Sequence, residues 1–164
     1  MWPFNRKSDD RERLRIRKAA SRYMDERLLL LLIESPEGLR MSEKRINFVL
    51  VLTDEASDPV STIREIVTLV QKHDGMIASF EGTLLTVYFG VPLPQPNQKE
   101  QRLKFVSDLS EKVRPLVAVV HGECECQVGK VGNEQRMGYT AFIPDFKGKL
   151  GKLCSLEVGQ IIEV

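Results

Sequence analysis

Long apolar runs are missing from this sequence, and its opening residues lack the pattern typical of a signal peptide. The longest aliphatic run, residues 28–33, is far shorter than the roughly 20 residues that span a bilayer. The opening residues Met1 to Arg6 contain no apolar core ahead of their charges, which argues against a signal peptide. From these absences we expect a cytoplasmic protein with no transmembrane segment.

Cysteine is scarce as well, with 3 residues in a chain of 164, which is too few for a disulfide framework. Cys124 and Cys126 should share one face of a strand, because side chains alternate with a period of two. A metal-binding pair is the alternative to packed thiols, but no Cys-x-x-Cys or His spacing accompanies it. The formal net charge of +1 gives no overall reason to expect nucleic acid as a partner.

What the sequence does contain is typical of a soluble globular domain, with 42% apolar and 29% charged residues. A chain of this length suits one hydrophobic core with a short appendage. We expect the appendage, a basic helix with its linker, at residues 1–40. The folded domain should occupy residues 41–164.

The first segment has no Gly or Pro between Asn5 and Ser35, so we expect one long helix. Pro36 and Gly38 then oppose its continuation. Two interpretations of its basic charge remain open: docking on an anionic surface or acidic partner, or a solvated arm that leads into the domain. Its apolar stripe would consist of Ile16, Ala20, Tyr23 and Leu30 or Leu31.

A strand and a helix are predicted at the start of the folded domain. The apolar run at residues 46–52 is typical of a strand buried on both faces. Asp58 then caps a helix that has Pro59 in its first turn. The spacing predicts a buried face made of Val60, Ile63, Val67 and Val70.

Two short strands, 76–80 and 84–89, follow as a hairpin, and a second helix begins at a capping box of Asn97 and Glu100. Its apolar face would consist of Leu103, Val106, Leu109 and Val113. Further strands complete an order of β-α-β-β-α-β with a C-terminal β extension. This is an α+β, ferredoxin-like arrangement, in which two helices cover one face of an antiparallel sheet. The arrangement by itself names no function.

Three stretches carry a resemblance to a known family. They are RYMDERLLLLLIESPEGLRMSEKRINFVLVLTDE, HDGMIASFEGTLLTVYFGVP and VGKVGNEQRMGYTAFIPD. In this order they resemble the catalytic domains of class III adenylyl and guanylyl cyclases. The resemblance implies a ferredoxin-like core for residues 41–164, head-to-tail dimers and active sites at the dimer interface. It also implies a reaction in which two metal ions, held by two aspartates, help close ATP or GTP into a cyclic monophosphate.

At the metal positions of the family, the resemblance gives one match and one loss. Asp54 matches the first metal aspartate, so it is also a candidate nucleotide-binding residue. The second aspartate falls on Thr83. Threonine carries no charge, and Mg²⁺ is normally held by carboxylates together with substrate phosphates. The resemblance therefore implies that the second ligand is lost.

At the positions that hold the nucleotide in the family, the match is weaker still. The base-reading lysine falls on Ser79, and its partner position falls on Thr140, a weak nucleotide-binding candidate. The transition-state asparagine falls on Gly148 and the arginine on Lys152, a weak catalytic candidate that lacks the planar fork of arginine. Glycines disfavour a helix here, so we expect a surface turn rather than the family's helix. A flexible phosphate-attracting loop is the alternative, built on Lys147, Lys149 and Lys152.

These losses favour a catalytically degenerate cyclase-like domain that serves as a regulatory or dimerisation module with weak nucleotide binding. Such a domain would not be an enzyme and would require no cofactor. Its partner would be a second copy or another cyclase-like domain. The alternative is an active, divergent class III cyclase that converts ATP to cyclic AMP with Mg²⁺ or Mn²⁺, or the non-catalytic half of a heterodimeric cyclase.

Overall fold

The computed structural model describes residues 6–164 and divides the chain into two compact units. The N-terminal unit ends at Leu39, and the C-terminal unit begins at Arg40. Among the described residues, no helix has the length and apolar character needed to cross a membrane.

The N-terminal unit contains α1 (Arg6–Ala20), α2 (Glu26–Glu34) and a short 3₁₀ helix, η1 (Pro36–Leu39). The expectation of one long helix is wrong, because the helix is interrupted after Ala20 and Asp25 caps a second helix, α2. Its carboxylate accepts a hydrogen bond from the Arg27 backbone N–H at 2.9 Å, which satisfies one free donor of the new helix. The expected apolar stripe is also wrong, since Tyr23 is 93% exposed and Ile16 is exposed.

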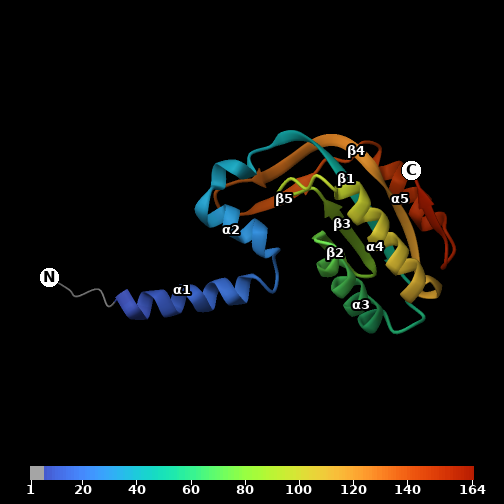
Figure 1. The fold of residues 1–164 in the computed structure, drawn as a ribbon, viewed down its shortest axis with the longest axis horizontal. Coiled ribbons are helices and arrows are strands. Elements are labelled where there is room, and N and C mark those ends of the chain that lie inside the picture. The colour runs from blue at the N-terminus through green and yellow to red at the C-terminus, as the bar shows by residue number, and fades with distance from the viewer. Residues whose placement is uncertain (1–5) are drawn as a thin grey trace. The chain divides into compact units, whose positions relative to one another are not determined.

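The C-terminal unit is built on one sheet with the strand order β2-β3-β1-β4-β5 (Figure 1). These neighbours are all antiparallel, and β6 pairs with β4 in parallel. The predicted α+β, ferredoxin-like fold with its C-terminal strand is confirmed. The strands are β1 (Ser42–Thr53), β2 (Met76–Glu81), β3 (Leu84–Phe89), β4 (Val117–Gly132), β5 (Met137–Ala141) and β6 (Ile161–Glu163).

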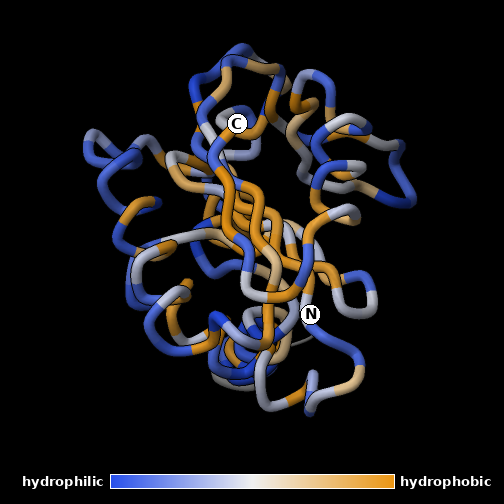
Figure 2. The backbone as a smooth tube through the Cα atoms, turned by 90° about the vertical axis from the view of Figure 1, so that its right-hand side faces the viewer, coloured by the Kyte–Doolittle hydropathy of each residue, from blue (hydrophilic) through white to orange (hydrophobic). Residues whose placement is uncertain are grey.

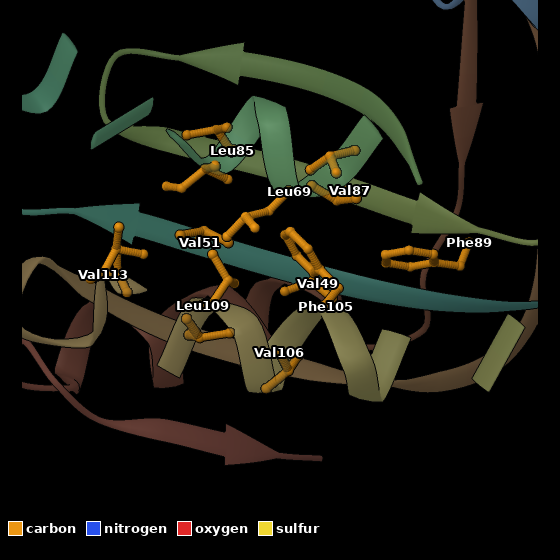
Figure 3. Close-up of a cluster of buried hydrophobic side chains, with 14 residues drawn as sticks. Val49, Val51, Leu69, Leu85, Val87, Phe89, Phe105, Val106, Leu109 and Val113 are labelled. Carbon is orange, nitrogen blue, oxygen red and sulfur yellow. The ribbon is translucent and has the colours of Figure 1, made fainter. Parts of the chain in front are cut away.

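Helices cover both faces of this sheet. On one face, α3 (Pro59–Lys72) and α4 (Gln98–Lys112) pack on Val49 and Val51 of β1 (Figure 3). On the other face, α5 (Phe146–Ser155) packs near Phe48 and Leu50, which alternate with those valines. A 3₁₀ turn, η2 (Arg114–Leu116), joins α4 to β4. Figure 2 shows the central strands as the most hydrophobic part of the backbone, as expected for a sheet buried on both sides.

The predicted buried faces of α3 and α4 are right in part, since Val70, Val106, Leu109 and Val113 are buried as predicted. In α3, the expected Val60 is 64% exposed; in α4, the expected Leu103 is 42% exposed, and Phe105 is buried in its place. More than one stripe satisfies a spacing of three and four residues, and tertiary packing selects among them. The buried residues are Thr62, Ile66, Leu69 and Val70 in α3, and Arg102, Phe105, Val106 and Leu109 in α4.

The two predicted helix caps also differ in outcome. Asp58 caps α3 as predicted, since its carboxylate accepts the Ser61 backbone N–H at 3.1 Å. Asn97 occupies the cap position of α4, but its side chain makes no capping hydrogen bond. The predicted capping box is therefore wrong in its hydrogen bonding, although the helix begins where it was expected.

The expected surface turn around Gly148 is also wrong, because this stretch forms α5. Leu153 is fully buried against the sheet, and such burial stabilises by about 1.5–3 kcal/mol. Each glycine costs about 1 kcal/mol relative to alanine in a helix. Asp145 precedes the helix with a left-handed φ of 50°, and a Cβ at Gly148 would lie 2.3 Å from its Oδ2 atom. Leu150 of α5 also packs on this cluster, so the combined burial outweighs the roughly 2 kcal/mol that the two glycines cost.

Candidate functional site

Asp54 lies directly after β1, in a half-buried position. Its Oδ1 atom accepts the Ala56 backbone N–H at 3.0 Å, and its Oδ2 atom accepts the Ser57 hydroxyl at 2.9 Å. Its own N–H donates to the Leu116 carbonyl at 2.9 Å. The carboxylate is thus fixed by its own loop, with lone pairs left for one further partner.

Thr83 lies beside Thr53, the residue that precedes Asp54. The Thr53 backbone N–H donates to the Thr83 carbonyl at 2.9 Å, and the Thr53 hydroxyl donates to the same oxygen at 3.2 Å. Gly82, with a left-handed φ of 59°, forms the turn that brings Thr83 back toward β1. The structure therefore brings together the two positions that the resemblance assigns to metal ligands.

The side chains present here do not fit a pair of divalent ions. A two-metal site needs carboxylates that are shared between both ions, and of these two positions Asp54 alone supplies one. Within residues 6–164, no group of three or more His, Cys, Asp or Glu side chains is arranged to hold a metal. We therefore derive no catalytic step through such a pair.

Thr140 lies far from Asp54 within one chain. Thr53, next to Asp54, pairs with Val117 of β4, whereas Thr140 on β5 pairs with Gly129 of β4. Positions 117 and 129 are 12 residues apart, so these two ends lie on the order of 40 Å apart along the strand. Asp54 and Thr140 therefore lie next to opposite ends of β4.

The remaining candidates lie on other elements. Ser79 is exposed on β2, where the pairing with β3 shifts register between Ile77 and Ser79. Lys152 is exposed on α5, one turn after Lys149, whose ammonium lies 5.9 Å from the centre of the Phe48 ring. Phe48 pairs with β4 midway along that strand, so α5 crosses the middle of the sheet. The register of β1 with β4 therefore places Lys152 away from Asp54 and Thr83, which lie at the end of β1.

A buried polar cluster under α4 is the feature that the sequence reasoning missed. Arg102 is 0% exposed, and its Nη2 atom donates to Glu163 Oε1 of β6 at 2.6 Å. His121 is buried nearby, and its pKa is lowered by burial first and then by the Arg102 charge. Asn47 donates to Gln98 Oε1 at 3.2 Å. An asparagine within the apolar run at 46–52 was the one sequence signal of this cluster.

A second charged group lies at the C-terminal end of α3. Lys72 Nζ and His73 Nε2 each lie 2.8 Å from Asp108 Oδ2 of α4. These two partners hold the pKa of Asp108 at about 2, with Lys72 as the larger cause. His73 ends α3 as predicted. The group joins α3 to α4 and contains no nucleophile.

Comparison with known proteins gives a clear result for the fold. No protein-family model matches the chain, and no curated protein matches it. Solved structures of nucleotide cyclases do match. The adenylyl cyclase CyaB from P. aeruginosa aligns with a TM-score of 0.59 and 19% identity, over 76% of this chain and 79% of that one.

Two guanylyl cyclases align in the same way. Guanylyl cyclase Cya2 has a TM-score of 0.57 and 17% identity, over 75% of this chain and 76% of that one. The guanylate cyclase domain of RhGC from Catenaria anguillulae, in complex with GTP, has a TM-score of 0.62 and 9% identity, over 74% and 79%. The chain has the fold of class III adenylyl and guanylyl cyclase catalytic domains, as the resemblance implied.

Proposed function

We propose that the C-terminal unit is a cyclase-like domain that has lost catalysis and serves as a dimerising regulatory module with a residual capacity to bind nucleotide. The observation that carries this proposal is the hydrogen bonding of Thr53, the residue before Asp54, to the Thr83 carbonyl at one end of the sheet. The second of the two positions that the resemblance assigns to metal ligands thus lies near the first, and its side chain is a neutral hydroxyl. A cation that accompanies a bound triphosphate would find one carboxylate at this end of the sheet, and one carboxylate holds a cation weakly.

The chemistry that remains is too limited for cyclisation. A cyclase must activate a ribose hydroxyl and stabilise the charge that develops at phosphorus. Gly148 offers no side chain for the ribose, and Lys152 offers a point charge in place of a planar fork. Each lost electrostatic group typically costs on the order of 10²–10³ in rate. The combined losses at Thr83, Ser79 and Gly148 therefore support a non-enzymatic role that needs no cofactor.

Dimerisation is supported by the distance between the remaining site residues. Asp54 and Thr140 lie too far apart in one chain to contact one nucleotide, which spans far less than the length of β4. Two chains placed head to tail would bring Asp54 of one beside Thr140 of the other. Exposed apolar side chains flank Thr140, as expected of an interface; they are Val131, Met137, Phe142 and Phe146.

The second candidate is an active, divergent cyclase, or the non-catalytic half of a heterodimer. The retention of Asp54 and Thr140 at family positions favours it. In the heterodimer, an intact partner domain would supply the second metal carboxylate, the asparagine and the arginine. Mg²⁺ or Mn²⁺ would then be required, and the pair would be a phosphorus-oxygen lyase.

The deciding experiment incubates the purified chain with ATP or GTP and either Mg²⁺ or Mn²⁺, and detects cyclic nucleotides by mass spectrometry. We expect no cyclic product. Formation of cyclic AMP or cyclic GMP at a rate abolished by Asp54→Ala, but not by the neighbouring Glu55→Ala, would contradict the proposal. Thermal-shift titrations with the same nucleotides then measure binding, because a ligand of the native state raises Tm with concentration.

Analytical ultracentrifugation tests the dimer separately. We expect a concentration-dependent monomer–dimer equilibrium, weakened by Phe142→Ser on the exposed face. Leu93→Ser, at an exposed leucine in the loop before α4, is the matched control. A monomer at all accessible concentrations would contradict the dimerisation part of the proposal.

A further inference from the structure

The strand β6 is a short element that pairs with β4 on the side away from β1 (Figure 1). It consists of Ile161–Glu163, and none of these residues is fully buried. Backbone hydrogen bonds hold both of its ends. The Val119 N–H donates to the Gln160 carbonyl at 3.0 Å, and the Val164 N–H donates to the His121 carbonyl at 2.9 Å. A segment with few buried side chains opens locally before the core does.

Arg102 joins α4 to this strand. Its side chain is 0% exposed, and its Nη2 atom donates to Glu163 Oε1 at 2.6 Å. Within residues 6–164, its Nε and Nη1 atoms have no hydrogen-bond partner. A guanidinium stays protonated in proteins, so this charge is buried with a single ion-pair partner.

The neighbouring polar groups supply no second countercharge. His121 lies opposite Glu163 in the register of β4 with β6. An imidazole is either neutral or cationic, so it cannot balance a guanidinium. Glu123 of β4 accepts a hydrogen bond from the Asn47 side-chain amide at 3.3 Å. The buried charge of Arg102 therefore depends on a carboxylate that is carried by a strand without a fully buried residue.

The two partners of this ion pair differ in their access to water. The Glu163 side chain is 57% exposed, whereas that of Arg102 is 0% exposed. Removal of one partner from a buried ion pair is strongly destabilising, because the other charge is left uncompensated. Arg102 cannot withdraw together with α4, since Phe105 and Leu109 of that helix are fully buried. Separation of β6 from β4 is then the smallest movement that lets water reach the guanidinium.

We propose that β6 is a detachable strap whose docking on β4 requires the negative charge of Glu163, because Arg102 is buried when the strap is docked. Separation uncovers the outer edge of β4 at residues 119–121, whose outward N–H and C=O groups then lack strand partners. The rest of the unit stays folded, because β6 adds only the half-buried Ile161 to the cluster under α3 and α4. The strap does not depend on the function proposed above.

Amide exchange of the labelled full chain, resolved by residue with NMR, tests the proposal in the wild type. Val119 and Val120 are adjacent and both 0% exposed, but their N–H groups point to opposite sides of β4. The Val119 N–H faces β6, and the Val120 N–H faces β1. After correction for intrinsic rates, we expect Val119 to exchange about tenfold faster or more. Equal rates would mean that β6 opens only with the core, and would overturn the proposal.

The charge of Glu163 is tested by Glu163→Gln, which preserves the shape of the side chain. We expect the exchange of Val119 to accelerate about tenfold or more, because a hydrogen bond to a charged group is lost. The exchange of Val120 should not change. Glu157→Gln, at an exposed position before β6, is the matched control and should alter neither amide. An unchanged rate at Val119 in Glu163→Gln overturns the proposal.

Arg102→Met separates the strap from an ordinary stabilising ion pair. Methionine occupies the site without a charge, so docking no longer requires Glu163. We expect Val119 to exchange as slowly as in the wild type, or more slowly. Combined with Glu163→Gln, Arg102→Met should cancel the acceleration. Equal acceleration in the two single variants, or no rescue in the double variant, overturns the role of Arg102.

Discussion

The two faces of the sheet in the C-terminal unit use alternate residues of the same strands, yet they are covered in different ways. On one face, α3 and α4 close a continuous apolar cluster (Figure 3). On the other face, α5 carries two glycines and three lysines and covers a pair of thiols. The first face maintains the fold. The second carries Gly148 and Lys152, which the resemblance assigns to the family's transition-state positions.

The largest effect is expected on the face covered by two helices. Phe105→Ala removes a fully buried ring that lies 5.7 Å from the ring of Phe89, and should lower the free energy of unfolding by about 3–5 kcal/mol. Urea denaturation followed by circular dichroism measures the loss. Leu103→Ala, on the exposed side of α4, should change stability by about 0.5 kcal/mol or less. Similar losses in the two variants would show that the helix face is assigned wrongly.

A smaller and more local effect is expected on the opposite face. Leu153→Ala should cost about 2–4 kcal/mol, because this leucine of α5 is fully buried. Amide hydrogen exchange should accelerate in α5 more than in α3 and α4, since α5 packs through few other buried residues. Lys147→Ala is the control on the exposed side of α5. Uniform acceleration throughout the unit would mean that α5 belongs to the same cooperative core.

The α3–α4 pairing should also respond to acid through Asp108. Its carboxyl has a pKa of about 2 in the folded chain, below the usual value of about 3.9. A carboxyl group whose pKa is lower in the folded chain stabilises the folded state at pH values above its pKa in the unfolded chain. This stabilisation is lost as the pH falls from about 4 to 2. Asp108→Asn should therefore be less stable than the wild type at pH 6, and the difference should shrink toward pH 2. A difference independent of pH would exclude this ion pair as its cause.

The smallest effect compares the two glycines of α5. A Cβ at Gly151 would meet no atom within 4 Å, so Gly151→Ala should stabilise the unit by about 0.5–1 kcal/mol. At Gly148 a Cβ would lie 2.3 Å from the Asp145 carboxylate, which must then move. We expect Gly148→Ala to gain less than Gly151→Ala or to lose stability. Equal gains in Tm would show that Asp145 rearranges without cost.

Except for α5, the order and type of the elements in the C-terminal unit were predictable because strands and helices leave different apolar periods. The full extent of a helix face was not predictable: the spacing gave Leu109 correctly, but tertiary packing buries Phe105 and leaves Leu103 exposed. Local rules also gave the wrong result at Gly148, where the burial of Leu153 outweighs helix propensity. In the N-terminal unit, the cap at Asp25 divides a stretch that has no glycine or proline.

Only those parts of the candidate site that depend on residues close together in the sequence were predictable. The sequence places Asp54 at the end of a strand, and its proximity to Thr83 follows from the pairing of β1 with β3. The wide separation of Thr140 from Asp54 depends on the length of β4, which continues without a break through Gly129 to Gly132. The burial of Arg102 could not be foreseen, because its partner Glu163 lies 61 residues further along the chain.

The length of β4 has a thermodynamic consequence for any nucleotide that contacts both Asp54 and Thr140. If such a ligand requires two chains, it binds the assembled form and not the separate chains. Linkage then makes the effects reciprocal: nucleotide raises the affinity between chains by the same factor by which assembly raises the affinity for nucleotide. A long, continuous strand would in this way convert the level of a small molecule into the extent of protein association, without any chemical turnover.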